Sequence, residues 1–156
     1  MIWTAIVAAL AAVLLAGAGG LATEIGPWYR ALRKPTWQPP DWAFGPAWTL
    51  ILGMAAWSGA LAWEAAPDAA GRLEVVVLFA VNGLFHFLWS PLFFRLKRPD
   101  WAFYEVTFLW FSCLALIIGL AGISTWASVL IVPYLLWVSF ASWLNFTIIR
   151  LNGPFR

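Results

Sequence analysis

Residues 34–48 read KPTWQPPDWAFGPAW and join a short basic segment to a long apolar run. The stretch holds three tryptophans, one phenylalanine and four prolines. Because proline fixes φ, removes an amide donor and restricts the residue before it, the sequence predicts an irregular but rigid connector. Aromatic side chains on such a connector suit a flat apolar ligand, since a loop that is already ordered loses little entropy on binding.

The composition around this stretch is that of a membrane protein. Of the 156 residues, 63% are hydrophobic and 10% are charged, whereas a soluble domain carries about 25% charged residues. The mean hydropathy is +0.84. The formal net charge is only +2, and no basic domain is present that would bind nucleic acid. We therefore expect an integral membrane protein in contact with lipid, without a nucleic-acid partner.

Five apolar runs make up most of the chain. A helix needs about 20 apolar residues to cross the hydrocarbon core, and runs of this length without strand-like alternation favour helices over a barrel. We predict an all-α integral membrane protein whose residues 1–156 form a single domain, a bundle of five transmembrane helices. The helices are expected at about 2–22, 44–63, 73–94, 101–122 and 125–149.

The first run has the length of a transmembrane helix rather than a secretory signal. No basic segment precedes it, and it exceeds the roughly 7 to 15 apolar residues of a signal core. Small residues recur along it at every fourth position, at Ala8, Ala12, Ala16 and Gly20. This spacing favours close packing against another helix.

The basic residues lie almost entirely on one side of the predicted bundle. They fall in the first loop, the third loop and the C-terminal end, at Arg30, Arg33, Lys34, Arg95, Lys97, Arg98, Arg150 and Arg156. Only Arg72 lies on the opposite side. The positive-inside rule then places the C-terminus in the cytoplasm and the N-terminus outside. Helical spans favour a bacterial inner membrane.

Polar side chains inside the third and fifth runs fall on one face of each helix. The recurring positions are Asn82, His86, Trp89 and Phe93 in the third run and Tyr134, Trp137, Ala141 and Asn145 in the fifth. Aromatic walls with a few hydrogen-bonding groups are typical of a pocket for a mostly apolar ligand. Alternatively, the asparagines and the histidine bond across helices and hold the bundle together, and the loop tryptophans anchor the chain at the membrane interface.

No catalytic or metal-binding set is evident. The lone His86 and the single Cys113 lie on different predicted helices. The acidic residues fall at loops or run ends, at Glu24, Asp41, Glu64, Asp68, Glu74, Asp100 and Glu105. A metal cluster therefore lacks ligands, so we expect no required cofactor and do not predict an enzyme. For His86 we favour a hydrogen bond within the bundle over ligation of haem iron.

Three motifs resemble those of the tryptophan-rich sensory protein family, also called the translocator protein or peripheral-type benzodiazepine receptor family (TspO/MBR). The first is KPTWQPP at 34–40, followed by Trp42, Phe44, Pro46, Trp48 and Thr49. The second is WSPLFF at 89–94. The third comprises Pro133, Tyr134, Trp137, Ala141, Leu144, Asn145, Leu151 and Asn152. Together the motifs span nearly the whole chain.

The resemblance implies a five-helix bundle, usually a homodimer, that binds porphyrins such as protoporphyrin IX and, in animal members, cholesterol and synthetic drug ligands. With the polar faces, it implies these ligand-binding residues: Trp37, Pro40, Trp42, Phe44, Trp48, Asn82, His86, Trp89, Phe93, Phe94, Tyr134, Trp137, Ala141 and Asn145. Two departures stand out: Asn82 and His86 replace a glutamine and an asparagine, and the bulky Phe140 is expected to narrow the pocket.

The ligand partners follow from the same resemblance. The porphyrin ring would stack on the aromatic walls, and its propionates are expected to reach Arg30, Arg33 or Lys34 at the rim. The sterol-recognition pattern of animal members is degenerate here, because Phe146 stands where the pattern needs tyrosine. A sterol-like lipid stays a candidate partner, but we do not expect cholesterol as the native ligand.

The sequence thus favours a membrane receptor, sensor or carrier for porphyrins that regulates tetrapyrrole traffic or the response to it. One alternative is light- and oxygen-dependent porphyrin degradation, which has been credited to some family members. Another is a small exporter or a regulatory membrane subunit. A proton-coupled exporter normally carries a membrane-embedded carboxylate. We expect none at the centre of any run, so that alternative depends on His86 alone.

Overall fold

The computed structural model describes residues 1–155. Its helices are α1 (Ile2–Ala22), α2 (Pro27–Ala31), α3 (Asp41–Ala65), α4 (Ala69–Ser90), the π-helical turn η1 (Pro91–Arg95), α5 (Pro99–Ala121) and α6 (Thr125–Asn152). Five helices, with η1 continuing α4, are long and apolar enough to cross a membrane. The prediction of an all-α, multi-pass membrane protein with five spanning helices is confirmed.

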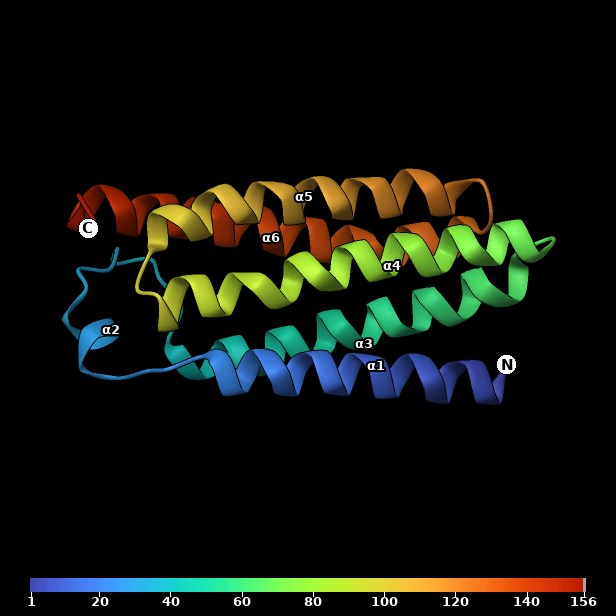
Figure 1. Ribbon diagram of the computed structural model, residues 1–156, viewed down its shortest axis with the longest axis horizontal. Coiled ribbons are helices and arrows are strands. Elements are labelled where there is room, and N and C mark those ends of the chain that lie inside the picture. Colours follow the sequence, from blue (N-terminus) through green and yellow to red (C-terminus); the bar gives the residue numbers. More distant parts are fainter. Residues whose placement is uncertain (156) are drawn as a thin grey trace.

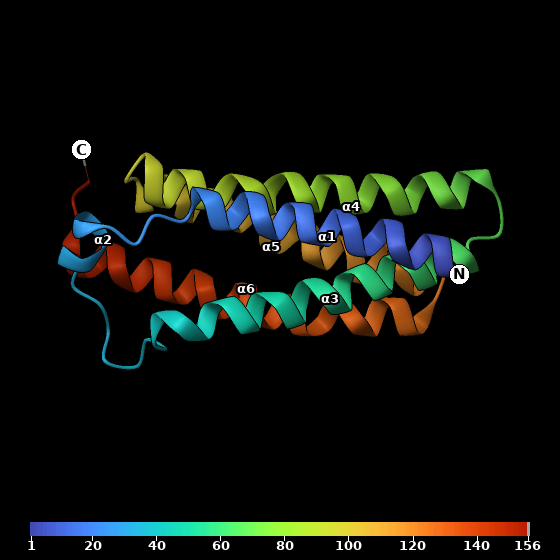
Figure 2. The ribbon, with the colours of Figure 1, turned by 90° about the horizontal axis from the view of Figure 1, so that it is seen from below.

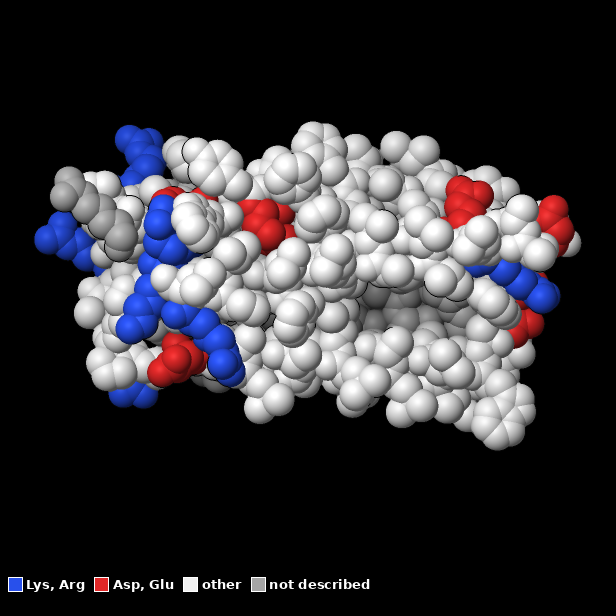
Figure 3. All heavy atoms as spheres, in the orientation of Figure 1, with Lys and Arg blue, Asp and Glu red and all other residues white. Residues whose placement is uncertain are grey.

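The five long helices run side by side along one axis (Figures 1 and 2). The N-terminus lies at one end with the α3–α4 and α5–α6 turns, and the C-terminus lies at the other with α2 and the α4–α5 turn. Lysine and arginine side chains gather mainly at the second end (Figure 3), called the basic end below. Arg156, which the sequence places with these residues, lies outside the described residues.

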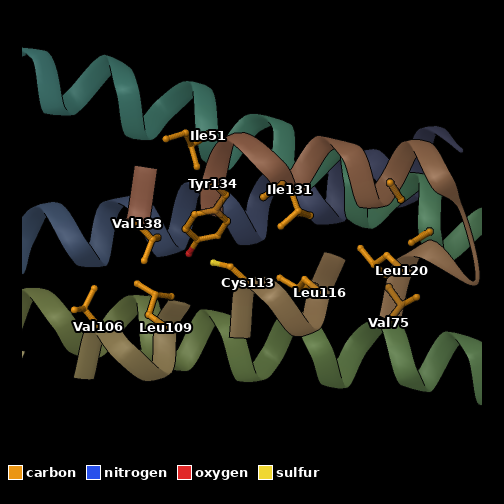
Figure 4. Packing of buried hydrophobic residues seen from close by; sticks show 13 residues of the cluster. Ile51, Val75, Val106, Leu109, Cys113, Leu116, Leu120, Ile131, Tyr134 and Val138 are labelled. Atoms are coloured by element: carbon orange, nitrogen blue, oxygen red, sulfur yellow. The ribbon is translucent and has the colours of Figure 1, made fainter. Parts of the chain in front are cut away.

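The core forms where α5 packs along α4 and α6, and where α3 packs along α6. Figure 4 shows α5 and α6 side chains meeting there, among them Val106, Leu109, Cys113, Leu116, Ile131, Tyr134 and Val138. Only Ala22 of α1 is buried, and most large side chains of α1 are exposed. The first helix therefore flanks the core instead of contributing to it.

Helix α3 begins earlier than the sequence predicts. It starts at Asp41, so Asp41–Trp48, the second half of the aromatic stretch, is helical and not an irregular connector. That part of the prediction is wrong. Pro40 occupies the N-cap position in an extended conformation, and the acidic Asp41 in the first turn is favourable at the positive end of the helix dipole. Helix α4 also starts early, because Asp68 Oδ1 accepts a hydrogen bond from Gly71 N (2.8 Å) and caps it.

The π-helical turn η1 explains how two adjacent phenylalanines both face inward. Pro91 has no amide hydrogen, so the regular hydrogen-bond pattern of α4 cannot continue through it, and a wider turn follows. Phe93 and Phe94 are 2% and 8% exposed, and their ring centroids are 4.8 Å apart. The proline thus positions two aromatic residues at the basic end of the bundle.

Candidate functional site

A cavity of about 530 Å³ lies inside the bundle and reaches toward the basic end. Residues of α1, α3, α4, η1, α5 and α6 line it, and the connector between α1 and α3 adds Tyr29 and Gln38. Most of the predicted site residues are on its wall: Phe44, Trp48, His86, Trp89, Phe93, Phe94, Trp137, Ala141 and Asn145. The structure therefore brings Trp48 of α3 together with the aromatic faces of α4 and α6.

The other predicted residues do not line the cavity. Pro40 and Trp42 are exposed, Trp42 to 75%. Trp37 lies outside the wall with its ring against Phe140 (centroids 5.9 Å apart). Asn82 and Tyr134 are buried between helices. Their placement off the wall agrees with the alternative in which the polar residues hold the bundle together.

Asn82 and Tyr134 make hydrogen bonds behind the wall. Asn82 Nδ2 donates to Ser112 Oγ (2.9 Å), which joins α4 to α5. Tyr134 Oη lies 2.9 Å from His86 Nδ1, which joins α6 to α4. His86 itself is on the wall, and its ring meets that of Trp48 edge to face at 4.8 Å between centroids. Tyr134 therefore acts on the cavity through the orientation of His86.

Phe140 does not narrow the cavity as predicted. Its ring packs against Trp137 (5.3 Å) and Trp37 (5.9 Å) on the outer side of α6, and it does not line the cavity. Asn145 on the wall ties α6 to the start of α5: its amide donates to Pro99 O (3.2 Å) and accepts from Phe103 N (3.1 Å).

The connector between α1 and α3 and the first residue of α3 supply three wall residues that the sequence did not indicate: Tyr29, Gln38 and Asp41, called the mouth triad below. Tyr29 Oη donates to Asp41 Oδ1 (2.9 Å), and Gln38 Nε2 donates to Tyr29 Oη (3.1 Å). Burial and, next, the hydrogen bond to Asp41 raise the pKa of Tyr29 to about 12. The phenol therefore keeps its proton at neutral pH.

Contacts of its middle part hold the connector in place. Asn152 Oδ1 accepts from Arg33 N (2.7 Å), and Asn152 Nδ2 donates to Arg33 O (2.8 Å). The Tyr29 ring packs on Phe94 with centroids 5.4 Å apart, and Lys34 Nζ donates to Tyr29 O (2.7 Å). The contacts of Arg33 and Tyr29 fix the connector against the end of α6 and against η1.

The small residues of α1 form the remaining wall. Ala16, Gly19 and Gly20 line the cavity, and a Cβ added to either glycine would meet nothing within 4 Å. These positions leave space in the cavity and do not admit another helix.

Comparison with known proteins identifies the family. The sequence profile of the TspO/MBR family matches residues 4–151. The chain belongs to the TspO/MBR family. It is 40% identical to the tryptophan-rich protein TspO of Chlorobaculum tepidum over 80% of this chain and 79% of that protein. It is 34% identical to the tryptophan-rich sensory protein of Cereibacter sphaeroides (97% and 94%) and 29% identical to the human translocator protein (83% and 77%).

Two indole nitrogens near the cavity of this TspO/MBR protein have no hydrogen-bond partner within residues 1–155. They are Nε1 of Trp89 and Nε1 of Trp137, both buried, and both residues line the cavity. An indole nitrogen is a donor only, and buried polar groups are normally paired. A ligand that carries a hydrogen-bond acceptor would satisfy them.

Glu105 corrects the expectation that every acidic residue lies at a loop or run end. It sits in the second turn of α5, is 7% exposed, and neither carboxyl oxygen has a partner within residues 1–155. The sequence placed Glu105 at a run end because it lies only one helical turn beyond Trp101, where the apolar run was taken to begin. Its helix neighbours Val106 and Leu109 line the cavity.

The described residues show no metal centre. No three His, Cys, Asp or Glu residues within 1–155 are grouped so that they could hold a metal ion. Cys113 is buried, and Asn82 Nδ2 lies 3.4 Å from its sulfur.

Proposed function

We propose that this TspO/MBR protein is a membrane receptor or sensor, or a carrier, that binds porphyrins of the protoporphyrin IX type and regulates their traffic or the response to them. The observation that carries the proposal is the aromatic cavity of about 530 Å³ inside the bundle. Small-molecule pockets measure about 300 to 1,000 Å³ and combine apolar walls with a few polar groups. The names of two relatives, a sensory protein and a translocator protein, are consistent with this role.

The chemistry of the wall suits a flat aromatic ligand. The rings of Trp48, Trp89 and Trp137 are on the wall, and an aromatic pair adds about 0.5 to 1.5 kcal/mol beyond the burial of its area. The unpartnered indole hydrogens of Trp89 and Trp137 would donate to acceptor atoms of the ligand. We further propose that the basic end faces the cytoplasm of a bacterial inner membrane, with the N-terminus outside, and that the protein works as a homodimer.

Quenching of tryptophan fluorescence by protoporphyrin IX tests this proposal. Trp48 lines the cavity, whereas Trp57, on the same helix, is 47% exposed and away from it. Titrations of the wild type, Trp48→Phe and Trp57→Phe should all saturate at micromolar ligand or below. We expect Trp48→Phe to weaken binding at least threefold and Trp57→Phe to leave the affinity unchanged. Quenching that does not saturate, or equal effects of both variants, would remove the cavity as the binding site.

Glu105 favours a second candidate function, a proton-coupled carrier. A buried, unpartnered carboxyl group within a spanning helix is what such a carrier needs to exchange protons against cargo. Porphyrin flux into proteoliposomes, measured with and without a pH gradient, tests it. A coupled carrier should lose the effect of the gradient in Glu105→Gln but keep it in Glu74→Gln, a control at an exposed position of α4. If the flux depends neither on the pH gradient nor on Glu105, the protein is not a proton-coupled carrier, and the receptor or passive carrier stays the proposed function.

A further inference from the structure

Within the mouth triad, the hydroxyl proton of Tyr29 and one amide hydrogen of Gln38 are already used in hydrogen bonds. A carboxylate can only accept, so the Tyr29 hydroxyl must give its proton to Asp41, and Gln38 must then use its amide nitrogen to donate to Tyr29. This arrangement fixes the orientation of the Gln38 amide. Gln38 Oε1 is buried and has no partner within residues 1–155. Apart from the second amide hydrogen of Gln38, the groups that the triad still offers to a ligand are acceptors, and one of them is the Asp41 carboxylate.

Two threonines on the same wall do not supply free hydrogen-bond donors. Thr23 Oγ1 donates to Gly19 O (2.8 Å), and Thr49 Oγ1 donates to Gly45 O (2.9 Å). Both residues line the cavity, but their hydroxyl protons bond to helix carbonyl groups. A ligand would meet lone pairs there as well.

No positive side chain compensates Asp41 from inside the cavity. Among residues 1–155, no lysine or arginine lines the cavity, and Asp41 makes no ion pair. Lys34, the nearest basic residue in the connector motif, donates to Tyr29 O and lies over the Tyr29 ring, 4.1 Å from its centroid. Arg30 and Arg33 are exposed and off the wall.

The start of α3 would otherwise attract an anion. The first turn of a helix exposes amide hydrogens and carries the positive end of the helix dipole, so ligand carboxylates bind well there. Here Asp41 is the first residue of α3 and supplies that negative charge itself. The Asp41 carboxylate thus offsets the positive end of the α3 dipole at the mouth.

We propose that Asp41, with Gln38, is a specificity-determining element that keeps ligand carboxylates out of the cavity and admits uncharged or hydrogen-donating ligand groups. This inference rests on the proposed function and refines its ligand class. A tetrapyrrole diacid would insert its apolar edge first and leave its propionates outside, against the basic end. A neutral tetrapyrrole, with no carboxylate to hold outside, would bind at least as tightly as the diacid.

The test compares protoporphyrin IX with its dimethyl ester on three proteins: wild type, Asp41→Asn and Asp68→Asn. Asparagine at 41 keeps the size of the side chain and an oxygen that can accept from Tyr29. Asp68→Asn removes the same charge at the far end of the molecule, where asparagine still caps α4. We expect Asp41→Asn to tighten binding of the diacid five- to tenfold and to change binding of the ester less than twofold. Asp68→Asn should change neither.

A second variant covers the case in which Asp41→Asn does not fold. Gln38→Glu adds a negative charge at the mouth, and we expect it to weaken binding of the diacid at least fivefold with little effect on the ester. Added salt should reduce this difference, because charges near water are screened.

The outcomes separate the two proposals. If both ligands bind the wild type and neither variant changes the ratio of their affinities, Asp41 is not the specificity element, and the porphyrin receptor stands without it. A wild type that binds the ester tenfold more weakly than the diacid would also overturn the inference, because the site would then recognise carboxylates. If neither ligand binds saturably, the proposed function fails and the inference fails with it.

Discussion

Replacing Ala141 by phenylalanine should block the cavity without unfolding the protein. Ala141 lies on the wall of α6, one helical turn from both Trp137 and Asn145, which are also on the wall. A phenyl ring needs a space of about 150 Å³, more than a quarter of the cavity of about 530 Å³. The new ring would therefore occupy space that a porphyrin ring needs between α4 and α6.

The expected loss of affinity follows from this geometry. A porphyrin that cannot reach Trp137 loses a stacking contact worth about 0.5 to 1.5 kcal/mol, as well as the apolar area buried at that wall. Since about 1.4 kcal/mol corresponds to a tenfold change in affinity, we expect Ala141→Phe to weaken binding of protoporphyrin IX at least tenfold. Because the ring enters open space, the midpoint of thermal unfolding should change by only a few degrees.

The control is Ala11→Phe, the same substitution at an exposed position of α1 that does not line the cavity. Fluorescence titration gives the affinities, and circular dichroism on heating gives the unfolding midpoints. A folded Ala141→Phe protein that binds porphyrin as tightly as Ala11→Phe would refute the reasoning, because the ligand would then lie outside this cavity.

Three further predictions concern buried side chains that make hydrogen bonds. Tyr134→Phe removes the bond to His86, and should lower the free energy of unfolding in mixed micelles by about 0.6 kcal/mol and by no more than about 1.7 kcal/mol. Porphyrin affinity should stay within twofold, because His86 keeps its contact with the Trp48 ring; a larger change would show that the bond from Tyr134 sets a His86 orientation that the ligand needs. Ser58→Ala removes the bond from a fully buried hydroxyl to Ala127 O (2.6 Å), and should lower that free energy by about 1 kcal/mol without affecting binding. Folding raises the pKa of Tyr29 to about 12, above its usual value of about 10. The protonated phenol therefore stabilises the fold fully below about pH 10, and this contribution is lost as the pH rises through about 12. Tyr29→Phe should remove this part of the decrease in the free energy of unfolding at alkaline pH.

The sequence was a sufficient guide to the spans and to much of the cavity wall. Runs of about 20 apolar residues have few alternatives in a bilayer, and the aromatic positions of α4 and α6 follow the helical repeat. Trp89, Trp137 and Ala141 accordingly lie on the cavity wall. The same repeat also selected Asn82 and Tyr134, which face neighbouring helices. A helical stripe is wide enough to touch both a cavity and the adjacent helix, and spacing alone does not separate the two.

The connector was less predictable because no repeat fixes its side chains. The bond from Tyr29 to Asp41 joins residues twelve positions apart, and only the folded path of the connector brings them together. Trp37 and Trp42 illustrate the converse: both belong to the aromatic motif, yet they lie off the wall. Motif membership therefore identified the region of the mouth but not the side chains that form it.

Gly20 of α1, with Ala8, Ala12 and Ala16, was expected to admit a neighbouring helix, but at Gly20 and at the adjacent Gly19 the structure shows a different effect. A Cβ at Gly119 of α5 would lie 2.7 Å from Leu78 Cδ1, which is the close approach that such a glycine permits. A Cβ at Gly19 or Gly20 would meet nothing within 4 Å. The α1 wall thus leaves open space at Gly19 and Gly20, which have no side chains, whereas the opposite walls carry large aromatic rings. The volume of the cavity depends on this asymmetry.

A cavity of this size has an energetic consequence for how binding is measured. The atoms that line empty apolar space have no partners on one side and lose dispersion contacts, and the cavity of about 530 Å³ is several times larger than the space that a benzene ring fills. The cavity is therefore expected to hold lipid chains or detergent whenever its ligand is absent. Porphyrin binding is then an exchange with these molecules, and its affinity depends on how well they fill the cavity. Because protoporphyrin IX and its dimethyl ester displace the same occupant from any one variant, the contribution of that occupant cancels in the ratio of their two affinities, and this ratio can be compared between wild type and Asp41→Asn.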